Sequence, residues 1–125
     1  MFHITDEQFQ ELIDEALTKL PQTYVELMKG KVAILWEDDP SPEQREKLKL
    51  NANQTLFGLY EGLPLSQRYS GYSKITPDKI TIFRNPMLGR CNNIVELKEE
   101  IKHTLWHEMA HYFGLDHERI SELEK

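Results

Sequence analysis

The chain carries a group of metal-ligating side chains between residues 107 and 117. His107, Glu108, His111, Gly114 and His117 occur in the order H-E-x-x-H-x-x-G-x-x-H. Residues i and i+4 of an α-helix lie on one face, so His107 and His111 can bind a single metal ion. Glu108 lies about 100° around the helix from His107, where it can reach a water on the metal without being a ligand. This spacing predicts a catalytic zinc site.

The third histidine of the motif lies too far along the chain to reach the metal from the same straight helix. Glycine tolerates the left-handed conformation that commonly ends a helix, so an end at Gly114 would let the chain turn His117 back. Three neutral imidazoles leave a fourth tetrahedral position for water, whose pKa zinc lowers to about 7. Glu108 would take the proton of that water and pass it to a leaving amine. The predicted reaction is metal-assisted hydrolysis of an amide, most simply a peptide bond.

A long helix is expected to carry the motif. Asn92 or Asn93 can cap its start. Apolar residues recur along it at helical spacing and form one stripe: Ile94, Leu97, Ile101, Leu105, Met109 and Tyr112. Such an apolar helix is expected to be buried, and a metal would then provide partners for its polar side chains. The simpler alternative is a core helix with hydrogen-bonded histidines, and the completeness of the motif favours the zinc site.

The rest of the chain predicts an α+β fold. Thr5 is expected to cap a first helix, with Gln8 in the capping-box position and Pro21 at its end. Residues 43–53 are expected to form a short surface helix or a loop, and a last short helix is expected after the motif. With 125 residues, we expect a single domain over residues 1–125.

Four segments read as strands: residues 31–37, 55–61, 67–73 and 79–84. The first is apolar on both faces, so we expect it to be central in the sheet. Gly58 lies within the second and indicates a bulge or a close contact.

Composition narrows the classes of function and compartment. The net charge is −6 and the isoelectric point is near 5.4, which disfavours nucleic acid as a partner. No apolar run reaches transmembrane length, and the N-terminus lacks the basic and apolar segments of a secretory signal. The single cysteine, Cys91, excludes an internal disulfide and is expected to be an ordinary loop or core thiol. We therefore expect a cytoplasmic protein that does not contact a membrane.

The chain resembles the small bacterial zincin-like metallopeptidases sometimes called minimal zincins. The resemblance is carried by HEMAHYFGLDH at 107–117, LFGLYEGLPL at 56–65 and PDKITIFR at 77–84. It implies a zincin-like α+β core, in which a few-stranded mixed sheet with an antiparallel edge strand above the metal packs on a long motif-bearing helix. It implies zinc ligands at His107, His111 and His117, with Glu108 as general base, and a peptide or protein substrate.

The chain departs from larger zincins in two ways. Metzincins have a methionine turn downstream of the third ligand, whereas no methionine follows His117 here. Proteinases usually also have a C-terminal subdomain that forms the far wall of the cleft, and we expect none here. We therefore expect a shallow cleft or one that a protein partner completes, and a peptidase that is weak or narrow in specificity.

Two other functions are compatible with the three histidines. A family of bacterial metal-dependent endoribonucleases binds its metal through the same H-x3-H-x5-H spacing. That family typically lacks the glutamate after the first histidine, so Glu108 and the acidic charge favour peptide hydrolysis. A zinc-stabilised binding domain without turnover is the third alternative, and it leaves Glu108 without a role.

Further residues near the motif are weaker candidates. His103 lies one turn before the first motif histidine and is expected at the edge of the cleft, too far along the helix to be a ligand. Asp116 can hydrogen-bond a ligand imidazole, although capping or exposure explains it equally well. Arg68, Tyr69 and Tyr72 can line the strand beside which a substrate binds, and a tyrosine there can donate to an oxyanion. Ordinary packing is the simpler interpretation of these three residues.

Overall fold

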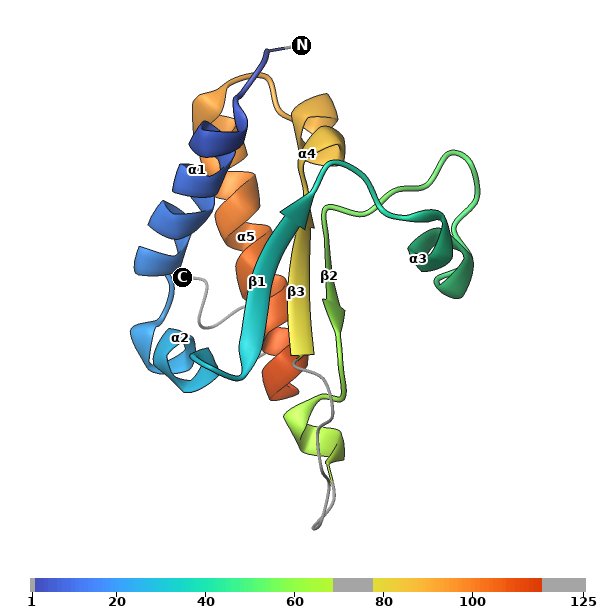
Figure 1. Cartoon of the computed structure of the whole chain (residues 1–125). Coiled ribbons are helices and arrows are strands. Elements are labelled where there is room, and N and C mark those ends of the chain that lie inside the picture. Colours follow the sequence, from blue (N-terminus) through green and yellow to red (C-terminus); the bar gives the residue numbers. More distant parts are fainter. Residues whose placement is uncertain (1, 69–77, 116–125) are drawn as a thin grey trace.

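A three-stranded mixed sheet lies at the centre of the molecule (Figure 1). The computed structural model describes residues 2–68 and 78–115. The strand order is β1-β3-β2, with β1 parallel and β2 antiparallel to β3. The strands are β1 (Val32–Glu37), β2 (Gly58–Glu61) and β3 (Asp78–Phe83). The predicted α+β architecture with a mixed sheet and an antiparallel edge strand is confirmed.

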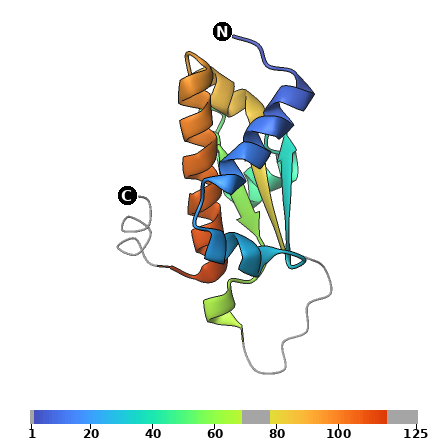
Figure 2. The ribbon, with the colours of Figure 1, turned by 90° about the vertical axis from the view of Figure 1, so that its left-hand side faces the viewer.

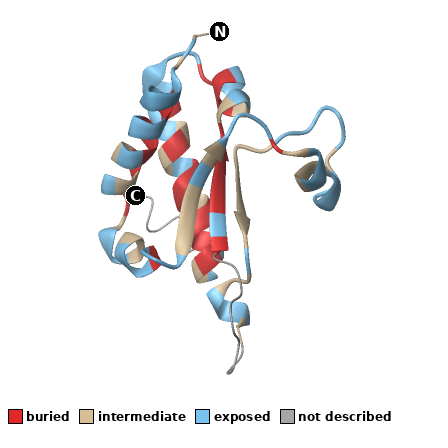
Figure 3. Ribbon diagram, viewed as in Figure 1, coloured by how far each residue is buried: buried red, intermediate tan, exposed pale blue. Residues whose placement is uncertain are grey.

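The central strand is β3, so the prediction that residues 31–37 form the central strand is wrong. Every residue of β3 is buried except Lys79 (Figure 3). Within the described residues, β1 pairs with β3 alone. One face of β1 packs on the core, where the Trp36 and Phe9 rings meet edge to face at 5.2 Å. Leu35 points the other way and is 45% exposed, so the apolar residues on that face do not mark a second buried layer.

The two longest helices pack together on one face of the sheet (Figures 1 and 2). The longest helix, α5, contacts β3 and β2, and α1 lies against it. The helices are α1 (Asp6–Thr18), α2 (Gln22–Met28), α3 (Pro42–Lys47), α4 (Arg84–Arg90) and α5 (Ile94–Phe113), with a short 3-10 helix, η1 (Leu65–Gln67). Within residues 2–68 and 78–115, none of these helices has both the length and the apolar character needed to cross a bilayer.

Local capping explains where the first helix begins. The Thr5 side chain accepts from the Gln8 backbone N–H at 3.1 Å, and the Gln8 side chain accepts from the Thr5 N–H at 2.9 Å. This is the predicted capping box, which satisfies backbone donors that the first turn leaves unpaired. The inward face of α1 buries Phe9, Leu12 and Ile13, which fixes the helix to the core.

Several other segments differ from the expectations or refine them. Residues 42–47 form the short surface helix α3, which was one of two alternatives, and Ser41 and Gln44 form a second capping box there. The short helices α2 and α4 were not predicted, and α4 ends the strand over 79–84 one residue early, at Phe83. Residues 67 and 68 belong to η1 and its cap, so the strand predicted over 67–73 is wrong there. The remainder of that strand lies outside the described residues.

Candidate metal centre

The helix that carries the motif begins and ends where the sequence predicts. The Asn93 side chain accepts from the Glu96 N–H at 3.0 Å and caps the first turn of α5. At the other end, Gly114 has φ 73° and ψ 31°, the left-handed conformation expected of a C-terminal glycine. The Gly114 N–H donates to the His111 carbonyl at 3.1 Å, and the next N–H, of Leu115, donates to the Ala110 carbonyl at 3.0 Å. The helix therefore ends directly after the first two motif histidines.

Gly114 also allows a close contact with η1. A Cβ atom at residue 114 would lie 2.3 Å from the Ser66 Oγ and 2.6 Å from its Cβ. Both distances are too short for non-bonded atoms, so only glycine fits between α5 and η1. The end of the motif helix is therefore fixed by both its conformation and its packing.

Three motif side chains come together on α5. The ligand atoms of His107, Glu108 and His111 all lie within 4.8 Å of one another. The His107 and His111 ring centres are 4.6 Å apart, as expected for residues one turn apart. Glu108 is buried, His107 is half-buried and His111 is exposed. Imidazole nitrogens and a carboxylate are donors that zinc accepts, so this set fits a zinc ion.

The predicted third ligand, His117, lies outside the described residues, as does Asp116. The role of His117 as a metal ligand therefore stays a prediction. That prediction requires the helix to end at Gly114 in the left-handed conformation, and α5 ends there in this way.

The carboxylate of Glu108 is held by groups on two elements. Its Oε1 accepts from the Tyr60 N–H of β2 at 3.0 Å and lies 3.1 Å from the His111 Nδ1. The hydrogen bond to Glu108 raises the pKa of His111, although partial burial of the ring acts in the opposite direction. Glu108 thus joins the motif helix to β2, because it contacts both the candidate metal ligand His111 and the backbone of the strand.

A cleft opens beside these side chains, between α5 and the segment that leads into β2. Its volume is about 460 Å³. The lining residues come from two stretches of chain and from Arg90: Thr55, Leu56, Phe57, Gly58, Arg90, Glu100, His103, Thr104, His107 and Glu108. Glu108 is part of this lining, so a substrate in the cleft would lie beside its carboxylate.

Two predictions about residues near the cleft agree with its geometry. His103 lines it, and its ring is stacked on that of His107 with the centres 6.2 Å apart. A Cβ atom at Gly58 would lie 2.5 Å from the Thr104 Cγ2, which confirms the predicted close contact. Because Gly58 has no side chain, β2 can approach α5 closely enough for its backbone to reach Glu108.

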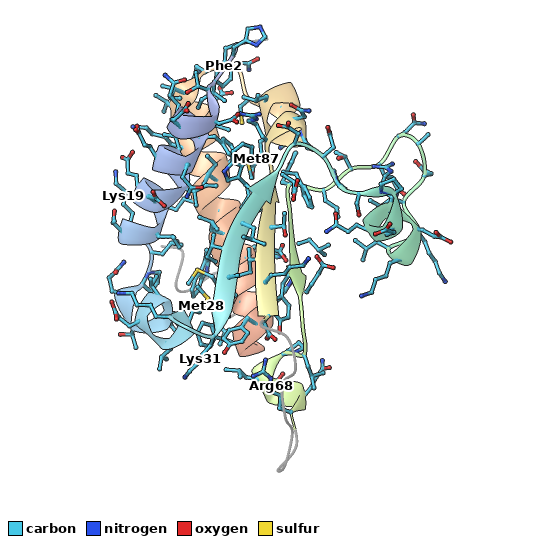
Figure 4. The ribbon with its side chains drawn as sticks, viewed as in Figure 1. Phe2, Lys19, Met28, Lys31, Arg68 and Met87 are labelled. Atoms are coloured by element: carbon cyan, nitrogen blue, oxygen red, sulfur yellow. The ribbon has the colours of Figure 1, made fainter. Side chains whose placement is uncertain are left out.

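The sequence suggested that Arg68 lies on an edge strand beside the site, and the structure places it elsewhere. It follows η1 at the lower end of the sheet in Figure 4, and its guanidinium pairs with the buried carboxylate of Asp78. Tyr60 donates its O–H to the same carboxylate at 2.6 Å. Neither Tyr60 nor Asp78 was singled out from the sequence, where each lies within a segment that carries the family resemblance. Tyr69 and Tyr72 lie outside the described residues.

Comparison with known proteins gives a family and a fold. The family described as zincin-like metallopeptidase matches residues 29–125 of the chain. Among solved structures, a conserved hypothetical protein from Thermo thermophilus is similar, with a TM-score of 0.59 and 19% identity. The similarity covers 88% of this chain and 94% of that one, and at this identity it concerns the fold alone. Comparison with functionally curated proteins finds no significant sequence match.

Proposed function

Because the chain belongs to the zincin-like metallopeptidase family, we propose that it is a zinc-dependent peptidase that hydrolyses peptide bonds. The observation that carries the proposal is the cluster of His107, Glu108 and His111, which adjoins the cleft beside β2. Family membership implies a metal ion, typically zinc, and His107 and His111 of this cluster provide two donors for it. The motif and its surroundings therefore indicate the same chemistry.

We assign His107, His111 and His117 as the residues that hold the metal. The first two are imidazoles one turn apart on a rigid helix, and the third follows the turn at Gly114. When bound, zinc supplies a Lewis acid that acidifies a coordinated water and polarises a substrate carbonyl.

Glu108 is assigned as the general base. Its side chain is buried, lines the cleft and is oriented by the Tyr60 N–H. It accepts the proton of the attacking water and then donates it to the leaving amine nitrogen. A base held by a backbone donor needs little rearrangement before the reaction, which favours proton transfer.

The position of β2 favours an extended peptide as substrate. Within the described residues β2 pairs only with β3, so its other edge faces the cleft region. An extended peptide can add to such an edge through main-chain hydrogen bonds. The Tyr60 N–H already donates to Glu108, so we place the peptide beside the residues that precede Tyr60, where the cleft is lined by Phe57 and Gly58.

A digest of a peptide library with the zinc-loaded chain, beside the Glu108→Gln variant, tests the proposal. The wild type should cleave peptides, and the variant should keep its zinc and lose at least about 100-fold in rate, as removal of a general base predicts. Retained turnover in Glu108→Gln would contradict the assignment of the base. Metal analysis of His111→Ala and His117→Ala should show loss of bound zinc in each, and unchanged content would mean that the ligands lie elsewhere.

Structured RNA in a parallel reaction separates the alternatives. Cleavage of RNA and not of peptides, by both the wild type and Glu108→Gln, would support the endoribonuclease function instead. Zinc bound at one ion per chain with neither substrate cleaved would support a zinc-stabilised binding domain.

A further inference from the structure

A buried carboxylate lies at the start of β3, at the end of the sheet nearest η1. Asp78 is 2% exposed. It accepts from the Tyr60 O–H at 2.6 Å and pairs with the Arg68 guanidinium. A buried charge is costly unless it is paired and hydrogen-bonded, and here one cation and one phenol provide both. Removing either partner would leave Asp78 incompletely satisfied.

Arg68 connects this carboxylate to the loop that follows β2. Its Nε donates to the Leu63 carbonyl at 2.8 Å, while its terminal nitrogen contacts Asp78. A Cβ at Gly62 would lie between 2.5 and 2.8 Å from the carboxyl atoms of Asp78, so the loop passes directly over that group. Arg68 and Asp78 together fix the end of β2 against the start of β3.

Tyr60 is held at both ends. Its phenol donates to Asp78, and its backbone N–H donates to the Glu108 Oε1 at 3.0 Å. Its ring meets the Tyr112 ring edge to face at 5.9 Å, and the Arg68 guanidinium lies 5.5 Å from the centre of the Tyr112 ring. Burial and the neighbouring carboxylate raise the pKa of Tyr60, so its O–H stays a donor over the range in which proteins are studied.

We propose that Arg68 and Asp78 are positioning residues that hold the Glu108 carboxylate in place through Tyr60. β2 is only four residues long and, among the described strands, lies at an edge of the sheet. Its hydrogen bonds to β3 alone therefore hold it weakly. With the Asp78 carboxylate anchoring the phenol, the Tyr60 N–H stays directed at Glu108. The effect on catalysis rests on the proposed function, whereas the effect on the strand does not.

Amide hydrogen exchange at residue 60 in the zinc-loaded full-length chain tests the proposal. Arg68→Met removes the charge and its hydrogen bonds while keeping an apolar chain of similar length. The matched control is Arg84→Met, because Arg84 also bridges carboxylates (Asp6 and Asp38) and is equally covered, with 14% of its side chain exposed against 17% for Arg68. We expect exchange at residue 60 to be about tenfold faster in Arg68→Met, from the loss of charge-assisted hydrogen bonds, and unchanged in Arg84→Met.

Activity provides the second measurement. In Arg68→Met and in Tyr60→Phe, kcat should fall about tenfold while KM and the zinc content stay at wild-type values, because only the orientation of Glu108 changes. Arg84→Met should leave kcat unchanged. Tyr60→Phe keeps the ring and the backbone N–H and loses only the hydrogen bond to Asp78. If Arg68→Met does not fold, faster exchange at residue 60 in Tyr60→Phe tests the same positioning role.

The two proposals fail in different ways. Equal exchange at residue 60 in Arg68→Met and Arg84→Met, or in Tyr60→Phe and the wild type, would overturn the positioning role. A wild-type chain that binds zinc and cleaves no peptide would refute the proposed function alone, while exchange at residue 60 would still show whether Arg68 and Asp78 hold the strand.

Discussion

Replacing Gly58 by alanine tests how closely β2 must lie against α5. The new Cβ would be 2.5 Å from the Thr104 Cγ2, 3.3 Å from the Ile82 Cδ1 and 3.4 Å from the Glu108 Cγ. Carbon atoms in contact are normally about 3.5–4.0 Å apart, so β2 and Thr104 would have to separate by about 1 Å. That movement would stretch the 3.0 Å hydrogen bond between the Tyr60 N–H and Glu108 beyond the range of a hydrogen bond.

The cost can be estimated from the surroundings. Thr104 is 5% exposed, and its β-branched side chain has few rotamers in a helix. Its hydroxyl donates to the Glu100 Oε2 at 3.1 Å, which opposes rotation of the methyl group out of the way. Overpacking of this kind typically costs about 1–3 kcal/mol. We expect Gly58→Ala to lower the free energy of unfolding by about 2 kcal/mol, and Tm by about 8 °C for a chain of this size.

Urea and thermal unfolding, followed by circular dichroism, measure this change. The matched variant is Thr104→Ser, which removes the methyl group in the way and keeps the hydroxyl that donates to Glu100. In the Gly58→Ala background it should restore at least about 1 kcal/mol, a coupling that contacting residues show and distant ones do not. Zinc affinity should change little, because the proposed ligands His107 and His111 both lie on α5.

Two results would refute this reasoning. Gly58→Ala could be as stable as the wild type, which would mean that β2 does not lie against Thr104 as described. Alternatively, the effects of Gly58→Ala and Thr104→Ser could simply add, which would locate the cost somewhere other than this contact.

Three further predictions follow from the helix end, the metal and the cysteine. Gly114→Ala would force a side chain into the left-handed conformation and onto Ser66, so it should lower the free energy of unfolding by at least about 2 kcal/mol and weaken zinc binding, measured by urea unfolding and metal titration; wild-type stability would contradict it. A chelator should lower Tm, because zinc at 100 times its Kd stabilises the fold by about 2.7 kcal/mol, and an unchanged Tm would argue against a bound metal. Burial raises the pKa of Cys91 above its ordinary value of 9.0, so iodoacetamide should label it much more slowly in the folded chain than in urea. The thiol should also favour the fold below pH 9 and lose that contribution as the pH rises further, since the unfolded chain releases the proton first; equal labelling rates would contradict this.

Features of the site that depend on neighbouring residues could be predicted from the sequence. The Asn93 cap, the left-handed Gly114 and the cluster of His107 and His111 are all set by spacings of a few residues. Helical geometry fixes such spacings before any tertiary contact forms. The close approach at Gly58 was also predictable, because a glycine inside a strand often marks a bulge or a closely approaching neighbour.

Features that depend on pairing between distant segments could not be predicted. An apolar strand fits either a central or an edge position, and only its pairing with β3 shows that β1 is an edge. The contacts that hold Glu108 likewise depend on distant segments. Tyr60 binds Asp78, which follows it by 18 positions, and Glu108, which follows it by 48. Nothing in the local pattern around Tyr60 distinguishes it from a tyrosine that only packs. The short helices α2 and α4 were missed for a related reason, since about two turns of helix give too little periodicity to recognise.

The position of α5 in the chain order has a consequence for biosynthesis. Ribosomes make the sheet and α1 first, yet the helix that covers Ile80 and Ile82 is the last described element to be made. Until α5 is complete, the nascent chain exposes this apolar sheet face, which is a surface that promotes aggregation. Folding of the two layers, and with it assembly of the metal centre, therefore has to wait until the whole motif helix has been synthesised. A chain truncated before residue 94 would lack α5 and could not bury the apolar face of the sheet.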